Sequence, residues 1–325
     1  MNSRRKLMVA LGVSALLPRW ATAQSSRVFR IGWLSNDRAE NSQFFDAFRD
    51  GLRDLGYVEG RNLIIDSRWG GGSAERTGQF AVELVRSNPE IIVAQGGPAL
   101  VPITRAGATM PVVFGYSGDP VEAKLVNSFA RPGGNLTGVS LLSLDLVGKR
   151  IELLKEILPT MKRVAIIARP EHPGEQGELR ASQDAAKSLN VAIDFHRVQK
   201  DSDLDDAFAA LARAHSDAIV IFPDAFMMRY CEKIAAFSVK NRVPAISGWA
   251  QFAESGNLMS YGPNLRDTFR RLATYVDKII KGVKPAELPV ELPMTVELVI
   301  NMKTAKALGL NIPQSTFLQA TKVIE

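Results

Sequence analysis

The chain has 325 residues, of which 46% are hydrophobic and 23% charged, and its formal net charge is +6. This length exceeds the comfortable size of a single hydrophobic core, so more than one folded unit is expected. The single cysteine, Cys231, excludes an intramolecular disulfide.

The first 23 residues have the pattern of a signal peptide. A basic segment, MNSRRK, precedes the apolar run LMVALGVSALL, and ATA at 21–23 is a small-x-small cleavage site. The run is too short to span a bilayer as a helix. We therefore expect export to the periplasm with cleavage before Gln24, which leaves 325 − 23 = 302 residues. The paired arginines fit a twin-arginine signal as well as a Sec signal, and both routes remain open.

Removal of this leader lowers the net charge of the chain. The lost charges are all basic (Arg4, Arg5, Lys6 and Arg19), so the net charge falls from +6 to 6 − 4 = +2. A nucleic-acid partner, which a strongly basic chain would favour, is therefore not expected. The sequence has no paired cysteines, no H-E-x-x-H motif and no acidic calcium loop, so no metal or other cofactor is predicted.

From Val28 onward, short apolar runs alternate with helical patterns, as in strand–helix units around a parallel sheet. The first half has expected strands at 28–34, 62–69, 90–95 and 111–115. Helices are expected between them, one of which places Phe44, Phe48, Leu52 and Leu55 on one face. A further helix is expected at 120–130, before the turn-rich segment RPGGN.

The second half repeats this alternation. Its expected strands lie at 163–168, 191–198, 217–223 and 243–247, with helices between them. The predicted fold class is therefore α/β, with two Rossmann-like lobes that each contain a parallel sheet.

Ligands of open parallel sheets bind beyond the carboxyl ends of the strands, where helix N-termini also point. This rule selects positions from both halves of the chain. The candidate ligand-binding residues are Ser35, Asn36, Gly96, Gly97, Pro98, Tyr116, Ser117, Asp119, Arg169, Asp224, Gly248 and Trp249. If the two lobes face each other, these residues line one crevice.

Several candidates also have a purely structural interpretation. Asp119 stands before a proline, the pair that caps and starts a helix, and Asp224 has the same ambiguity. The segment 96–98 lacks the spacing of a dinucleotide fingerprint and would free backbone N–H groups at a helix start. Tyr116 and Trp249 are either core aromatics or rings that stack on a ligand.

An enzymatic interpretation has little support. GYSGD at 115–119 approaches the G-x-S-x-G nucleophile elbow around Ser117, but its fifth position is Asp119. A triad also requires a histidine, and His172 alone lies near the carboxyl end of an expected strand. A hydrolase is thus a remote alternative, and we expect a protein that is not an enzyme.

Several segments resemble one known family. They are GLRDLGYVEGRNLIID, GDPVEAKLVNSFARPGGNLTGVS, GKRIELLKEILP, GNLMSYG, YVDKIIKGVKPAELPVELP and ELVINMKTAKALGLNIP. They are similar to the periplasmic substrate-binding proteins of ABC transporters, in the branch with tryptophan- and tyrosine-binding members, from about Val28 to Glu325. The resemblance implies a type I periplasmic binding fold, with two lobes around a hinge, and a permease of the inner membrane as partner.

The expected N-terminal lobe is 28–142, completed by about 262–288, and the expected C-terminal lobe is 143–261, completed by about 289–325. The chain departs from the family pattern at Gly97, where a Thr or Ser is more usual, and at Glu122 and Lys124, where DPVGAGLV has glycines.

The sequence thus predicts a monomeric, exported solute-binding protein. Its expected ligand is a carboxylate-bearing small molecule, an amino acid with aromatic ones favoured. Helix N-termini would hold the carboxylate, Asp119 or Asp224 the ammonium group, and Tyr116 or Trp249 the side chain. A periplasmic sensor of the same fold that signals to a membrane receptor is an alternative that the sequence leaves open.

Overall fold

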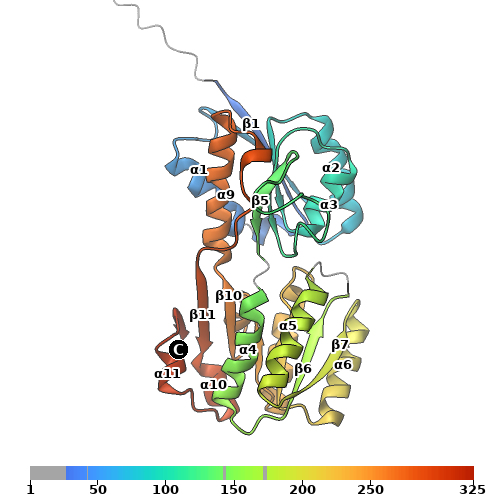
Figure 1. The fold of residues 1–325 in the computed structure, drawn as a ribbon, viewed down its shortest axis with the longest axis vertical. Coiled ribbons are helices and arrows are strands. Elements are labelled where there is room, and N and C mark those ends of the chain that lie inside the picture. Colours follow the sequence, from blue (N-terminus) through green and yellow to red (C-terminus); the bar gives the residue numbers. More distant parts are fainter. Residues whose placement is uncertain (1–26, 42, 142–143, 171–173) are drawn as a thin grey trace, which may run out of the picture.

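A computed structural model describes residues 27–325 except 42, 142–143 and 171–173. The expected signal peptide and His172 lie outside the described residues. Two α/β lobes are stacked along the long axis of the molecule (Figure 1). None of the helices in the described ranges has the length and apolar character that a bilayer-spanning helix requires.

The first lobe is built on a five-stranded sheet in the order β2-β1-β3-β4-β5, in which every pair is parallel. The strands are β1 (Phe29–Ser35), β2 (Leu63–Trp69), β3 (Ile91–Gln95), β4 (Val112–Tyr116) and β5 (Leu136–Ser140). Successive side chains of a strand point to opposite faces of the sheet. In β1, Trp33 accordingly joins the core beneath one face and Leu34 the core beneath the other.

Helices cover both faces of this sheet. They are η1 (Ala39–Asn41), α1 (Gln43–Asp54), α2 (Ala74–Arg86), α3 (Gly97–Arg105), α9 (Leu265–Ile280) and η3 (Pro285–Glu287). The predicted apolar face of α1 is confirmed for Phe44, Phe48 and Leu52, which are buried, whereas Leu55 lies beyond the helix and is exposed. Helices α1 and α9 pack against each other although the end of α1 at Asp54 and the start of α9 at Leu265 are 265 − 54 = 211 positions apart in the sequence.

The second lobe holds a seven-stranded sheet in the order β12-β11-β10-β9-β8-β6-β7. Its strands are β6 (Arg163–Ala168), β7 (Ala192–Arg197), β8 (Ala218–Ile221), β9 (Ala245–Ser247), β10 (Met259–Pro263), β11 (Val296–Asn301) and β12 (Lys322–Ile324). Its helices are α4 (Leu144–Ile157), α5 (Glu175–Ser188), α6 (Asp201–Ala214), η2 (Met227–Tyr230), α7 (Cys231–Asn241), α8 (Ala250–Glu254), α10 (Met302–Leu308) and α11 (Gln314–Phe317). All pairs are parallel except β10 with β11.

The prediction of a helix at 120–130 is wrong, because this segment forms turns and bends. The Asp119 carboxylate accepts hydrogen bonds from the backbone N–H groups of Val121 and Glu122 and starts one helical turn. The turn ends at Lys124, whose φ of 56° is left-handed and cannot continue a right-handed helix. The chain then runs on to β5, a strand that the sequence pattern did not indicate.

The chain passes between the lobes more than once. Strand β10 belongs to the second sheet, and α9, which follows it directly, packs against β4 and β5 of the first lobe. The segment after α9 stays with the first lobe as far as Glu291, whose N–H donates to Gly138 O at 3.0 Å. Strand β11 then returns to the second sheet (Figure 1).

Close backbone packing at the end of β10 gives the first testable prediction. A Cβ atom on Gly262 would lie 1.9 Å from the carbonyl oxygen of Gly248, so Gly262→Ala forces two backbone segments apart. We expect a loss of about 2–3 kcal/mol in the free energy of unfolding, measured by urea denaturation.

Gly78→Ala is the matched control, since Gly78 lies within α2 and nothing stands within 4 Å of its added Cβ. This variant should gain roughly 0.5–1 kcal/mol, because alanine restricts the unfolded chain. Equal stability of the two variants would contradict the close approach at Gly262.

Candidate functional site

The carboxyl ends of the parallel strands of each sheet face the other lobe (Figure 1). In the first sheet, Ser35 is in register with Gln95, and Gln95 with Gly115, so these strand ends form one edge. In the second sheet, Ile221 is in register with Ser247 in the same way. The strand-end residues of the two lobes are therefore the candidate site.

Ser35 and Asn36 hold the loop after β1 in place. Ser35 is fully buried, and its Oγ accepts the N–H of Asp37 at 3.0 Å. The Asn36 side-chain oxygen accepts the hydroxyl of Thr77 on α2 at 2.7 Å. Gly72 of the loop after β2 donates its N–H to Asn36 O at 2.6 Å. Both expected residues thus support the strand ends from within the first lobe.

Two polar residues at this edge, Asp37 and Gln95, were missed by the sequence prediction. Gln95 is the last residue of β3, and its Nε2 donates to Asp37 Oδ2 at 2.6 Å. Burial raises the pKa of the Asp37 carboxyl, while the Gln95 hydrogen bond and the charge of Arg229 oppose that rise. The strand-end rule could have found both, since Asp37 directly follows Asn36 and Gln95 ends the expected strand 90–95.

Gly96, Gly97 and Pro98 form the start of α3. Gly96 has a φ of 79°, a conformation that favours glycine, and its N–H donates to Gly115 O at 2.8 Å. Pro98 lies in the first turn, where a missing N–H costs no helical hydrogen bond. The start has no side-chain cap, as expected for a helix end with exposed backbone donors.

Tyr116, Ser117 and Asp119 follow β4. Tyr116 is buried in the core beneath α2 and α3, with its ring edge-on to Phe114 at 6.3 Å, and burial raises its pKa to about 12. Asp119 Oδ1 accepts two backbone N–H groups, at 2.7 and 3.1 Å, in the capping role expected from the sequence. Ser117 is half-buried. A nucleophile elbow requires a helix after this turn, and the structure has none there.

Arg169 and Asp224 lie together at the end of the second sheet. Arg169 Nη1 is 4.0 Å from Asp224 Oδ2, and its guanidinium carbon lies 5.0 Å from the centroid of the Phe226 ring. Asp224 Oδ1 accepts the N–H of Met227 at 2.7 Å and so caps the turn that leads into η2. The expected capping role of Asp224 and its position at the strand ends are therefore compatible.

Gly248 leaves space for a buried arginine. A Cβ on Gly248 would lie 2.5 Å from Nη2 of Arg150. Arg150 donates from Nε to Tyr261 O at 2.9 Å, and its Nη1 pairs with Glu178 at 3.3 Å. Both charged side chains are 3% exposed, and burial lowers the pKa of Arg150 while Glu178 counteracts that effect. Trp249 begins α8 and is buried in a core cluster.

Arg229 of η2 reaches across to the first lobe. Its Nη2 donates to Gly72 O at 3.0 Å, and its guanidinium carbon lies 6.0 Å from the Phe226 ring. Nothing in the sequence singles out this exposed arginine, because only the approach of the lobes brings it to Gly72. Within the described part of the chain, no cluster of three or more His, Cys, Asp or Glu residues could hold a metal ion.

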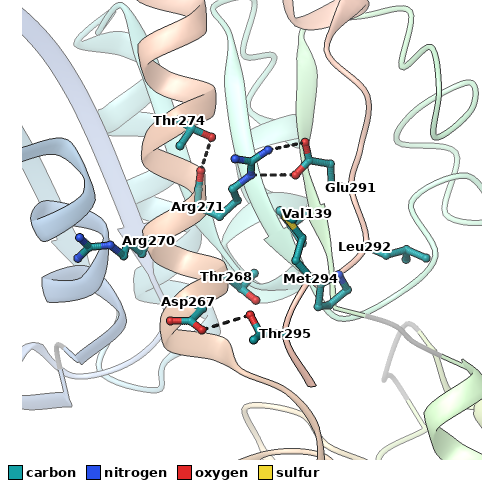
Figure 2. A pocket seen from close by; sticks show the side chains of 11 residues that line it. Val139, Asp267, Thr268, Arg270, Arg271, Thr274, Glu291, Leu292, Met294 and Thr295 are labelled. Atoms are coloured by element: carbon teal, nitrogen blue, oxygen red, sulfur yellow. Dashed lines mark hydrogen bonds and ion pairs between the residues drawn. The ribbon is translucent and has the colours of Figure 1, made fainter. Parts of the chain in front are cut away.

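A separate cavity of about 380 Å³ lies between α9 and the connection at 291–295 (Figure 2). Arg271 donates from Nε and Nη2 to the two carboxylate oxygens of Glu291, each at 3.0 Å. These hydrogen bonds hold the pKa of Glu291 below its usual range. The cavity adjoins the connection between the lobes and contains none of the strand-end residues, so we place the candidate site elsewhere.

Residues 39–324 match the model of a protein family described as ABC transporter substrate binding protein. The chain belongs to this family. The expected family is thus confirmed, and it is a family of binding proteins rather than enzymes. ABC transporter substrate-binding proteins act outside the cytoplasm, bind small molecules and work with an ABC transporter.

Individual relatives agree with this assignment. A tyrosine-binding protein of Clostridioides difficile is 25% identical over 264 residues, which cover 81% of this chain and 75% of the relative. A Vibrio cholerae domain protein of known structure has 28% identity and a TM-score of 0.82, over 92% of this chain and 99% of the other. An ABC domain from Streptococcus pneumonia in complex with L-Trp has 23% identity and a TM-score of 0.85, over 91% of this chain and 100% of the other. The expected two-lobe periplasmic binding fold is confirmed.

The Arg271–Glu291 pair gives a prediction about pH. The pKa of Glu291 is lower in the folded protein than its usual value near 4.3 in an unfolded chain. The ion pair therefore stabilises the fold fully above that usual pKa, and this stabilisation is lost as the pH falls through the lowered pKa of the folded protein. Both side chains are about one-third exposed, so Glu291→Gln should lower the unfolding free energy by only about 0.5–1 kcal/mol at pH 7.

Urea denaturation at several pH values checks this, and the difference from the unmodified protein should vanish in acid. Glu287→Gln on η3 is the control, since Glu287 is exposed and no ion pair of it appears among the described residues. A constant difference at all pH values would show that the charge of Glu291 is not the cause.

Proposed function

We propose that this substrate-binding protein captures an amino acid, with aromatic ones favoured, between its two lobes and delivers it to the permease of an ABC transporter. The observation that carries the proposal is the group of side chains at the end of the second sheet. Arg169 and Arg229 lie against the ring of Phe226, at 5.0 and 6.0 Å from its centroid.

This arrangement suits a carboxylate next to an apolar group. Guanidinium groups present several N–H donors in one plane, which match the two oxygens of a carboxylate. The half-buried ring of Phe226, with Tyr230 at 5.2 Å, provides an aromatic surface beside these donors. Aromatic rings pack favourably edge-to-face or offset, so the side chain of an aromatic amino acid fits here. The relatives named as tyrosine-binding and as a complex with L-Trp support the same ligand class.

We propose that the twelve residues predicted from the sequence contribute to this site in different ways. Ser35, Asn36 and Gly248 would support the strand ends, and Asp119 and Asp224 would cap turns at the border. The rings expected to stack on ligand, Tyr116 and Trp249, are buried, so we assign the stacking role to Phe226.

We further propose that the lobes divide as expected, with 28–142 and about 262–288 in one lobe and 143–261 and about 289–325 in the other. The connections between them would act as the hinge, and closure would follow the rigid-body motion of other two-lobe binding proteins. The protein would act as a monomer in the periplasm. A sensor would use the same site, but the match to a transporter family favours transport.

The ligand class is tested by thermal unfolding of the purified protein with each of the twenty amino acids. L-Tryptophan or L-tyrosine at a hundred times its dissociation constant should add about 2.7 kcal/mol of stability. Indole and phenol lack the carboxylate and serve as control ligands that should not stabilise the protein. If no amino acid raises the melting temperature, the proposed function is wrong.

Export is tested by the intact mass of the protein recovered from the periplasm of a Gram-negative host. Because the leader ends in a small-x-small site, the mass should correspond to a chain that begins at Gln24. A chain of full length that stays in the cytoplasm would refute the proposed export.

A further inference from the structure

Asp37 differs in its charged neighbours from two other carboxylates of the chain, Asp66 and Asp224. Asp66 of the neighbouring strand is paired with Arg68, and Asp224 lies near Arg169. Among the described residues, by contrast, no Lys or Arg lies within ion-pair distance of Asp37, and its hydrogen-bond donor is the neutral amide of Gln95. Among the described residues, Asp37 is therefore a carboxylate of the first lobe with no direct ion pair, although the charge of Arg229 acts on it from a greater distance.

Such a carboxylate has an unfavourable environment until a cation reaches it. Partial burial removes solvent from Asp37 and raises the pKa of its carboxyl. The neutral hydrogen bond from Gln95 and the charge of Arg229 offset part of this loss. An ammonium group that donated to Asp37 would form a charge-assisted hydrogen bond, which is stronger than a neutral one.

The position of Asp37 suits a ligand that touches both lobes. Its neighbour Asn36 accepts the N–H of Gly72, and Gly72 O accepts Arg229 Nη2 from the other lobe. Asp37 is therefore at the face where the lobes meet, and the charge of Arg229 acts on it. A negative group on the first lobe thus lies near Arg229 of the second lobe.

A carboxylate on one lobe and a guanidinium group on the other match the two charges of a zwitterion. We propose that Asp37, oriented by Gln95, accepts the α-ammonium group of the bound amino acid, so that the site selects amino acids over carboxylates that lack an amino group. The inference rests on the proposed function, in which the arginines at Phe226 hold the ligand carboxylate. Asp119 and Asp224 are less suited to this role. Asp119 Oδ1 accepts two backbone N–H groups, and Asp224 accepts the N–H of Met227 and lies near Arg169.

Calorimetric titration of Asp37→Asn tests the inference with two pairs of probes. The pairs are L-tyrosine with 3-(4-hydroxyphenyl)propionate and L-tryptophan with indole-3-propionate, which differ by the amino group. Asparagine keeps the size of the side chain and removes its charge. The amino acids should bind about 10- to 150-fold more weakly to the variant, as expected for loss of one charge-assisted hydrogen bond, while the des-amino acids bind as before.

Asp66→Asn is the matched control, since it makes the same substitution at a partly buried carboxylate of the adjacent strand. It should leave the affinity for all four probes within about twofold, the usual size of effects away from a site. Circular dichroism melting curves establish that each variant is folded.

Gln95→Met is a second variant in case Asp37→Asn does not fold. It keeps the length of the side chain and removes the donor that orients Asp37. The affinity for the amino acids should fall by roughly 3- to 10-fold, the value of one neutral hydrogen bond, and that for the des-amino acids should not change.

The outcomes separate the two proposals. If the unmodified protein binds an amino acid no better than its des-amino partner, or if either variant weakens both members of a pair equally, the role of Asp37 is refuted and the carboxylate site stands. If the unmodified protein binds neither L-tyrosine nor L-tryptophan nor any other amino acid, the proposed function is refuted and the role of Asp37 with it.

Discussion

The parallel alignment of the strands is the constraint on which the rest of this structure depends. Parallel strands joined by helices bring the carboxyl ends of β1–β5 to one edge of the first sheet and those of β6–β10 to one edge of the second, whereas β11 and β12 run the opposite way. Because β10 continues directly into α9 of the other lobe, that edge of each sheet is also where the chain crosses between the lobes. The polar residues that end the strands are therefore brought to the interlobe face by the connectivity of the backbone.

At this face, some polar groups make contacts within one lobe, and others lie close to the opposite lobe. Asp119 bonds to nearby backbone N–H groups, and the Asn36 side chain accepts the hydroxyl of Thr77. These contacts satisfy buried polar atoms and keep the strand ends rigid. Asp37 and Arg229 come from different lobes, and the positive charge of Arg229 acts on the Asp37 carboxyl. Arg169 lies beside the same Phe226 ring as Arg229. A small zwitterion complements this distribution of charge.

The capping roles of Asp119 and Asp224 were predictable because a cap depends on residues within three positions in the sequence. The same local argument failed for the helix at 120–130. There the pattern of apolar residues was compatible with a helix, but the left-handed backbone of Lys124 ends the turn after four residues. Tyr116 and Trp249 were correctly placed after strands, yet the direction of each ring depends on packing against helices elsewhere in the chain.

The sequence by itself determined the α/β alternation, most strand positions, the family and the set of strand-end positions, because each of these follows from local periodicity or from contiguous motifs. Only the tertiary structure decided that Gln95 bonds to Asp37, that Gly248 accommodates the buried Arg150, and that Arg229 reaches Gly72. These contacts join residues between 58 and 157 positions apart. No local sequence pattern encodes contacts between residues so far apart in the chain, because these contacts form only when helices and sheets pack and the two lobes come together.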